Sequence, residues 1–264
     1  MDWLRVAAGA LTGLIVGLTG VGGGALMTPL LLLVFATAPA TAIGTDLIFA
    51  AITKVAIAGI HQRQRLIDWP IVVRLWCGSL TASAATLLWM RWQPVTAESA
   101  DFLRGAIAVA VCVTASGMIA QRHLQSLGAR IDREAVGGLR RWQAPVTVAA
   151  GAVLGALVTL TSVGAGALGA VFLLYLYPSR LTPPRLIATD VVHAIPLALF
   201  AGMGHLWIGN VDPRLLRDLL AGSIPAAIAG AYLSSRLPHV WLRWSLAIVL
   251  LVIGTRLLAD TWLR

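Results

Sequence analysis

The sequence predicts an all-α membrane protein that crosses the bilayer several times and is built from two homologous repeats. Three observations predict this fold class. Apolar residues make up 58% of the 264 positions and charged residues only 12%, about half of the charged share of a soluble domain. Several apolar blocks are long enough to cross a bilayer. A Gly-rich segment near the start of the chain recurs 142 residues later.

The repeat extends over much of both halves. At an offset of 142, the matched residues are Gly9, Gly13, Thr19, Val21, Gly22, Gly24, Ala25 and Leu26 with Gly151, Gly155, Thr161, Val163, Gly164, Gly166, Ala167 and Leu168. Farther along, the offset becomes 144, and the matches are Ile43, Thr45, Asp46, His61, Asp68, Gly78 and Ser79 with Ile187, Thr189, Asp190, His205, Asp212, Gly222 and Ser223. Duplicated halves with glycine-broken apolar stretches are typical of membrane transporters.

The apolar blocks give the expected helices in order. They run from Leu4 to Phe35, Ile43 to Ile60, Ile71 to Met90, Phe102 to Ala120, Val146 to Tyr177, Leu186 to Leu206, Leu215 to Leu233 and Val240 to Leu258. Each is near or above the ~20 residues that span a hydrocarbon core of ~30 Å. Most of the tryptophans fall near block ends, where an indole ring prefers the headgroup level.

Three segments follow from this pattern: a first transmembrane repeat over residues 1–120, a basic linker over 121–143 and a second transmembrane repeat over 144–264. The linker carries five arginines in one polar loop, so the positive-inside rule predicts that it is cytoplasmic. The net charge of +9 comes from arginines in loops. It therefore indicates anchoring and orientation in the bilayer and no nucleic-acid partner.

The first and fifth blocks decide the topology. Each is about 32 residues long, or ~48 Å as one helix, and glycines interrupt both. If each block folds back as a hairpin of two short helices, each repeat makes three further crossings. The repeats are then inverted and both termini face outward. If each block crosses once, the repeats are parallel and both termini lie inside. Loop charges fit both arrangements, and block length with the broken glycines favours the inverted one.

The two Gly-rich breaks are the strongest candidates for a site. Glycine weakens a helix by about 1 kcal/mol relative to alanine, and non-helical backbone within a membrane persists only inside protein or beside a wet cavity. A helix that restarts after the break presents free N–H groups and a positive dipole end, which favour an anion. The predicted substrate-binding residues here are Thr19, Gly20, Gly22, Gly23, Gly24, Thr161, Ser162, Gly164 and Gly166.

An alternative is that these glycines only allow helices to approach closely. Gly9 and Gly13, and likewise Gly151 and Gly155, have the small-residue spacing that is typical of such contacts.

Thr45 and Asp46, repeated as Thr189 and Asp190, each open an apolar block. One interpretation is structural: the threonine is an N-cap and the aspartate lies in the first helical turn. The other is functional, because carboxylates inside a membrane mark ion and proton paths. Both interpretations can hold together. We expect the two aspartates to carry a coupling proton and the two threonines to contribute to the substrate site.

Lys54 is the single lysine of the chain and follows Asp46 by eight residues, on roughly the same helix face. It can attract an anionic substrate or pair with Asp46; alternatively, it extends toward the membrane surface. His193 follows Asp190 by one helical turn and can share a proton with it, or it can be a hydrogen-bonded packing residue.

Four further residues match between the repeats. His61 and His205 lie near block ends and are expected at the membrane interface. Asp68 and Asp212 each precede a proline-containing helix start.

The chain resembles the TauE/SafE sulfite exporter family over nearly its whole length. The resemblance rests on a glycine series that ends in Pro29, on the run from Ile43 through Leu47, and on Ile67, Asp68 and Trp69. The glycines of the series are Gly13, Gly17, Gly20, Gly22, Gly23 and Gly24, with a weaker second copy in Gly155, Gly164, Gly166, Thr189, Asp190 and Asp212. It implies a multi-pass carrier of the inner (plasma) membrane that moves small sulfur-containing anions such as sulfite or organosulfonates, usually outward.

Two departures from the family pattern bear on the site. Asp46 and Asp190 stand where many members have a small polar residue, and Ser162 and Ala165 replace glycines in the second copy.

The sequence thus predicts a secondary transporter, with no cofactor and no metal site, that binds a small anion between the two breaks near the bilayer midplane. Asp46, Asp190 and His193 are the candidates for proton coupling. The alternatives are a non-transporting scaffold or assembly subunit, and an intramembrane enzyme. The enzyme is disfavoured because no motif places a nucleophile beside a base.

Overall fold

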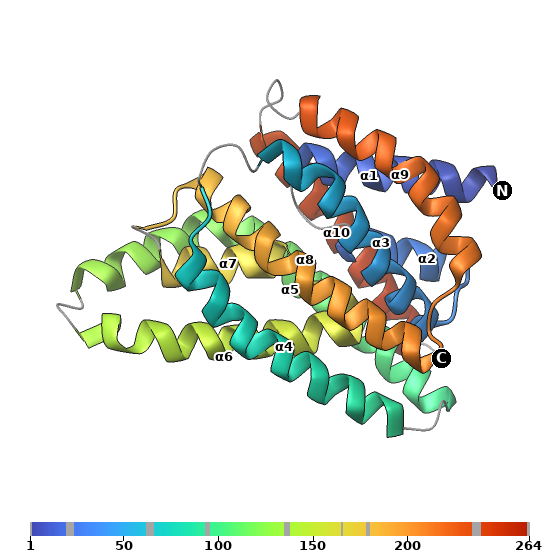
Figure 1. The fold of residues 1–264 in the computed structure, drawn as a ribbon, viewed down its shortest axis with the longest axis horizontal. Helices are drawn as coiled ribbons and strands as arrows, with labels where there is room; N and C mark the ends of the chain where they lie inside the picture. The colour runs from blue at the N-terminus through green and yellow to red at the C-terminus, as the bar shows by residue number, and fades with distance from the viewer. Residues whose placement is uncertain are drawn as a thin grey trace.

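The computed structural model describes residues 2–19, 24–61, 66–92, 96–134, 138–164, 166–177, 180–233 and 239–262. Within these ranges every regular element is an α-helix, which confirms the predicted all-α class. The helices are α1 (Trp3–Thr19), α2 (Gly24–Leu33), α3 (Pro39–His61), α4 (Trp69–Trp92), α5 (Ala97–Glu134), α6 (Gly138–Thr161), α7 (Ala167–Leu176), α8 (Pro183–Ile208), α9 (Pro213–Leu233) and α10 (His239–Trp262). Figure 1 shows their arrangement.

Six of these helices are long and apolar enough to cross a membrane, which supports the prediction of a multi-pass membrane protein. They are α3, α4, α5, α6, α8 and α10. Three expected boundaries were wrong. Helix α5 continues through most of the basic segment that was expected to be a loop. Helices α3 and α8 begin earlier than expected because Pro39 and Pro183 are favoured in the first helical turn.

The second long apolar block is interrupted, as its glycines predicted, whereas the predicted break of the first block falls outside the described part of the chain. Helix α1 ends at Thr19 and α2 begins at Gly24, with residues 20–23 outside the described part of the chain. In the second copy, α6 ends at Thr161 and α7 begins at Ala167. Between them, Gly164 and Gly166 have φ angles of 116° and 142°. Residues with a Cβ atom rarely adopt such angles, so glycine permits this break.

Each helix that precedes a break packs closely on a helix of the other half. Helix α1 lies against α9, and α6 lies against α4. A Cβ atom added to Gly9 would be 2.1 Å from the Leu219 carbonyl oxygen, and one added to Gly151 would be 2.5 Å from that of Leu75. Gly13 faces Ser223 in the same way. Residue numbers therefore rise together along the two helices, so α1 and α9 run parallel. These contacts confirm the predicted role of the small-residue spacing.

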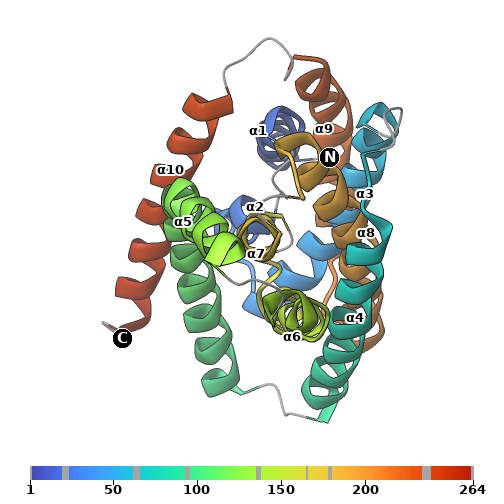
Figure 2. The same cartoon turned by 90° about the vertical axis from the view of Figure 1, so that its left-hand side faces the viewer.

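The helices α3 and α8, which carry the Thr-Asp pairs about two turns after their starts, run antiparallel. Gly44 lies against Asn210, whereas Ile48 lies against Gly202, so residue numbers fall on one helix as they rise on the other. Helices α5 and α10 are also antiparallel. Figure 2 shows α1, α2, α6 and α7 as a middle layer between α5 and α10 on one side and α3, α4, α8 and α9 on the other.

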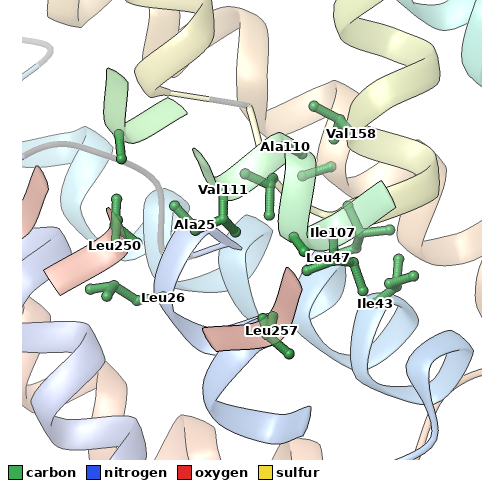
Figure 3. Close-up of a cluster of buried hydrophobic side chains, with 14 of the residues drawn as sticks. Ala25, Leu26, Ile43, Leu47, Ile107, Ala110, Val111, Val158, Leu250 and Leu257 are labelled. Carbon is green, nitrogen blue, oxygen red and sulfur yellow. The ribbon is translucent and has the colours of Figure 1, made fainter. Parts of the chain in front are cut away.

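The chain termini lie at one end of the bundle, and the adjoining ends of α5 and α6 lie at the opposite end (Figure 1). We call these the terminal face and the linker face. An apolar cluster joins the layers through side chains that include Leu26 of α2, Leu47 of α3, Val111 of α5 and Leu250 of α10 (Figure 3). This packing holds the half-helix α2 next to the polar residues described below, and a second cluster, which includes Leu75 of α4, Leu154 of α6 and Leu173 of α7, does the same for α7.

The glycine contacts generate a stability prediction. Gly155→Ala should destabilise the fold by roughly 1–3 kcal/mol, because the added methyl group would lie 2.1 Å from the Ser79 carbonyl oxygen and would force α6 away from α4. The measurement is thermal unfolding of the detergent-purified protein, followed by tryptophan fluorescence. Gly105→Ala is the matched control, since its nearest neighbour, Thr261 Cγ2, is 3.9 Å away. Equal unfolding temperatures for the two variants would contradict the prediction.

Candidate functional site

Four ionisable side chains meet between α3 and α8. Asp46 and Lys54 come from α3, Asp190 and His193 come from α8, and all four are at most 3% exposed. The antiparallel packing of the two helices brings these residues of both repeats together. Lys54 interacts electrostatically with Asp190, Asp46 and His193. We refer to these four residues as the central cluster.

Only one of the two carboxylate oxygens of Asp46 makes a hydrogen bond. Its Oδ2 atom accepts a hydrogen bond of 2.5 Å from the Thr28 hydroxyl of α2. Its Oδ1 atom is buried without a hydrogen-bond partner. The Ser162 hydroxyl, at the second break, lies near this carboxylate, but its Oγ atom also makes no hydrogen bond of acceptable geometry. The break of one repeat therefore lies beside the aspartate of the other.

Asp190 lies at the start of the half-helix α7. A Cβ atom added to Gly169 would be 2.2 Å from Asp190 Oδ1, so the carboxylate lies directly on the first turn of α7. This Oδ1 atom is also buried without a hydrogen-bond partner. The Gly166 N-cap of α7 supplies no side-chain hydrogen bond. A negative group is stabilised at this position by the helix dipole.

His193 bonds to a helix of the first repeat. Its Nε2 atom lies 3.0 Å from the Ser79 hydroxyl of α4, and its Nδ1 atom is buried without a partner. Its backbone carbonyl accepts a hydrogen bond of 3.2 Å from the indole of Trp76. The predicted proton sharing between His193 and Asp190 stays a prediction.

Lys54 is 1% exposed, so the alternative in which it extends to the membrane surface is wrong. Its ammonium group would have to leave the protein interior to reach the headgroups, and the carboxylates of Asp46 and Asp190 attract it inward.

The predicted hydroxyl donors at the breaks differ from one another. Thr19 donates to the Ile15 carbonyl at 2.7 Å, and Thr161 donates to the Leu157 carbonyl at 2.6 Å. Both hydroxyls thus satisfy carbonyl groups of their own helices. Only Ser162, which has a φ angle of 58°, faces the central cluster with a hydroxyl that lacks a partner. Three predicted residues lie outside the described part of the chain: Gly20, Gly22 and Gly23.

The N-cap interpretation of Thr45 and Thr189 is wrong, as is the placement of the neighbouring aspartates in a first turn. These residues lie two turns inside α3 and α8, because both helices begin at earlier prolines. The Thr45 hydroxyl accepts a hydrogen bond of 3.1 Å from the backbone N–H of Asp212, and that of Thr189 accepts one of 3.1 Å from Asp68. Each threonine therefore joins one repeat to the next helix start of the other.

Asp68 and Asp212 precede α4 and α9, as predicted, but their carboxylates accept hydrogen bonds from different kinds of partner. Asp212 Oδ1 accepts from the N–H groups of Arg214 and Leu215, the first turn of its own helix. Asp68 instead accepts two hydrogen bonds from Arg180, of 2.7 and 2.8 Å. This ion pair, which the sequence did not reveal, connects the two repeats.

His205 is fully buried inside the protein, one turn from the end of α8, and its predicted place near a membrane edge stays a prediction. Its Nε2 atom lies 2.9 Å from the Thr159 carbonyl oxygen of α6, which holds the ring inside the protein. The side chain of His61 lies outside the described part of the chain.

Sequence reasoning also missed Thr28, Gly169 and Ser79, which contact the central cluster. Ser79 was matched with Ser223 in the repeat, and this match was the available signal. Among the residues that the structure describes, no group of three or more His, Cys, Asp or Glu side chains is placed to hold a metal ion.

Comparison with known proteins decides the family. The family described as "Sulfite exporter TauE/SafE" matches residues 5–257. The chain belongs to this family. It is 33% identical over 263 residues to the probable membrane transporter protein YjnA of Bacillus subtilis (strain 168), with 96% of this chain and 98% of YjnA covered.

A second relative from the same organism, the probable membrane transporter protein YdhB, is 25% identical over 249 residues. That alignment covers 94% of this chain and 96% of YdhB. No solved structure matches. Membership of the TauE/SafE family makes this chain a membrane transporter and not an enzyme.

The central cluster generates a second stability prediction. Lys54→Met should lower the free energy of unfolding by roughly 3–5 kcal/mol, because it leaves two buried carboxylates without their cation. Adding Asp190→Asn to Lys54→Met should restore part of this loss by removing one negative charge. Thermal unfolding in detergent measures both effects.

Arg104→Met is the control for this experiment, since Arg104 pairs with the exposed Asp101 and should change stability little. A double variant no more stable than Lys54→Met would show that charge balance does not hold the cluster together.

Proposed function

We propose that this TauE/SafE-family protein is a secondary transporter that exports a small sulfur-containing anion, such as sulfite or an organosulfonate. One observation carries the proposal. Four buried polar atoms without hydrogen-bond partners are associated with Lys54 and its neighbours: Asp46 Oδ1, Ser162 Oγ, Asp190 Oδ1 and His193 Nδ1. Each such atom costs about 1–3 kcal/mol when it stays unpaired. A set of them in one place is typical of a binding site.

The chemistry of this set suits an oxyanion. Lys54 supplies a positive charge, and Ser162 supplies a hydroxyl donor. The first turn of α7 supplies backbone N–H groups and the positive end of a helix dipole. We place the substrate between the two breaks, beside α2 and α7, with Gly24, Gly164 and Gly166 allowing its close approach.

Two carboxylates in an anion site require protons. As long as Asp190 is ionised, its charge occupies the start of α7 that the substrate would use. A protonated carboxyl group gives up that charge and becomes a donor. We therefore infer that Asp46 and Asp190, with His193, take up a proton as the anion binds, so that the two move together.

The helix directions support two inverted repeats. If the repeats are related by an axis in the membrane plane, repeat-equivalent helices at the interface must cross antiparallel. Helices α3 and α8, and also α5 and α10, have this relation. In this arrangement α1–α2 and α6–α7 are hairpins that enter the bilayer from opposite faces, and rocking of the repeats gives alternating access. The linker face is cytoplasmic and the terminal face is external, at the inner (plasma) membrane.

A scaffold or assembly subunit explains the central cluster less well. A non-transporting protein gains nothing from a buried lysine and four unpaired polar atoms, since apolar packing at the same positions is as stable or more stable.

The function is tested by anion flux. Purified protein in lipid vesicles should move sulfite or a small organosulfonate faster than empty vesicles do. Lys54→Gln should lower the rate on the order of tenfold or more, because the site loses its cation, and Lys54→Arg should keep part of the activity. Asp101→Asn, at an exposed residue, should leave the rate unchanged. If wild-type protein moves no sulfite, sulfonate, sulfate or thiosulfate, the proposal is wrong.

The topology is tested by accessibility. Tags at the two termini should both react with a membrane-impermeant reagent from outside right-side-out membrane vesicles. A tag inserted in the linker between α5 and α6 should react only after the membrane is opened. Parallel repeats predict that all three tags become reactive only after opening, since the termini would then share the cytoplasmic face with the linker.

A further inference from the structure

Three arginines gather around the start of α4 and the end of α7. Arg180 donates two hydrogen bonds, of 2.7 and 2.8 Å, to the carboxylate of Asp68. Arg74 of α4 donates one of 3.3 Å to the Tyr177 hydroxyl at the end of α7. The guanidinium group of Arg185, on α8, lies 3.8 Å from Asp68 Oδ2, which is too far for a hydrogen bond. We call Arg74, Arg180 and Arg185 the arginine group.

The arginine group lies at the linker face, with its partners buried and its own side chains partly exposed. The end of α7 bonds to the first turns of α6, because the Gln143 side chain donates to the Leu176 carbonyl oxygen at 3.2 Å. Tyr177 is 2% exposed, whereas the side chains of Arg180 and Arg185 are 47% and 40% exposed. The guanidinium groups therefore form the outer part of a polar site whose inner part is closed.

The group carries more positive charge than its partners neutralise. Among the residues that the structure describes, Asp68 is the one carboxylate that pairs with these arginines. Both of its oxygens accept hydrogen bonds from Arg180. Arg74 bonds to a tyrosine hydroxyl, which is uncharged at neutral pH. Three positive charges against one negative charge leave an excess of two, which Arg74 and Arg185 contribute.

The equivalent positions on the terminal face do not form such a group. At the offset of 144, Asp218 stands at the position of Arg74, and Thr41 stands at the position of Arg185. Helix α9 packs on α1 as α4 packs on α6, so this helix pair forms with either an aspartate or an arginine at that position. Packing therefore does not require the arginine, and the two faces differ in charge at matched positions.

Two connections lead from the arginine group to the central cluster. The backbone N–H of Asp68 donates to the Thr189 hydroxyl at 3.1 Å, and Thr189 directly precedes Asp190. Helix α7 forms the second connection, because Gly169 in its first turn lies against Asp190 and Tyr177 at its end bonds to the arginine group. Eight residues of helix rise about 12 Å. The arginine group is therefore about two turns of α7 from the central cluster.

We propose that the arginine group is a docking site that captures a small oxyanion at the linker face before the anion passes to Lys54. The site rests on the proposed function, since it is where the transported anion first binds. A guanidinium group donates two parallel N–H bonds to the oxygens of one anion. Arg185 makes no hydrogen bond within the described part of the chain, and Arg74 bonds only to a neutral hydroxyl. Both can bind an anion while the pair of Asp68 and Arg180 stays intact.

The first test is the dependence of flux on sulfite concentration in vesicles that contain the purified protein. The variants are Arg185→Gln and the pair Arg74→Gln with Arg185→Gln. We expect the paired variant to raise the half-saturating sulfite concentration about tenfold, because the site no longer concentrates the anion. The maximal rate should stay near that of the wild type, since Lys54 is unchanged. Added salt should reduce the difference by screening the arginine charges, and Arg185→Lys should keep part of the affinity.

The matched control removes two arginines from elsewhere in the chain. Arg130→Gln with Arg133→Gln, near the end of the α5 sequence, lowers the net charge by the same amount. It should change the half-saturating concentration little. If the paired variant does not fold, Arg185→Gln alone tests the site, because it breaks no hydrogen bond that the structure describes.

The second test needs no transport. Thr182→Cys places a thiol three residues before Arg185, at an exposed position without a side-chain capping bond. The free cysteines Cys77 and Cys112 are replaced by serine. In neutral detergent, a methanethiosulfonate that carries a sulfonate group should modify this thiol faster, relative to one that carries a trimethylammonium group, than it does in the paired Arg74→Gln and Arg185→Gln variant. The expected difference is about tenfold, and methanesulfonate should slow the sulfonate reagent.

Four results would overturn the docking site. If the variants keep the wild-type half-saturation and thiol rates, the site is wrong and the transporter proposal stands. If the control arginines have the same effect, general surface charge explains the result. If the effect requires phosphatidylglycerol and is absent in phosphatidylcholine vesicles and in detergent, the arginines bind a lipid headgroup. If the wild-type protein moves no anion, the proposed function fails and the docking role fails with it, whatever the thiol rates.

Discussion

The burial of Lys54 between two aspartates is the constraint on which the centre of this structure depends. A lone ammonium group inside a bilayer protein costs several kcal/mol unless carboxylates lie beside it. Asp46 is on the same helix as Lys54, whereas Asp190 comes from the other repeat. Helix α3 therefore packs on α8, and Thr28 of α2 and Ser162 of the second break lie beside the same carboxylate of Asp46.

Glycine contacts determine how the repeats fit around that centre. Helix α1 packs on α9 and α6 packs on α4, so each helix that leads into a break is held by a helix of the other repeat. The Thr45 and Thr189 hydroxyls connect the repeats in the same reciprocal way. The two halves of the chain therefore interlock instead of lying side by side.

Much of the fold could be predicted because its signals are local. The lengths of the apolar blocks predicted the helices, and Gly164 and Gly166 predicted the break between α6 and α7. The spacing of Gly9 and Gly13 predicted the close contact between α1 and another helix. The early starts of α3 and α8 were missed, although Pro39 and Pro183 were visible, because the apolar run begins several residues later.

The site was harder to predict, because partners distant in sequence decide it. Asp46, Asp190, Lys54 and His193 were found as intramembrane charges, but Thr28 and Gly169 look like ordinary helix residues until the hairpins are folded. The burial of His205 inside the protein could not be predicted, because its partner is the Thr159 carbonyl. Every residue has a backbone carbonyl group, so a sequence does not show which one accepts a side-chain hydrogen bond.

The ion pair between Asp68 and Arg180 makes the linker face of the protein different from the terminal face. Arg180 follows α7, whose last turn is tied to the start of α6 through Gln143, so this bond lies at the linker face. Its counterpart Asp212 caps its own helix. Separating the hairpin from α4 there means breaking two charge-assisted hydrogen bonds, each stronger than a neutral one. The linker face is therefore joined by an ion pair at the position where, on the terminal face, the equivalent carboxylate bonds to its own helix.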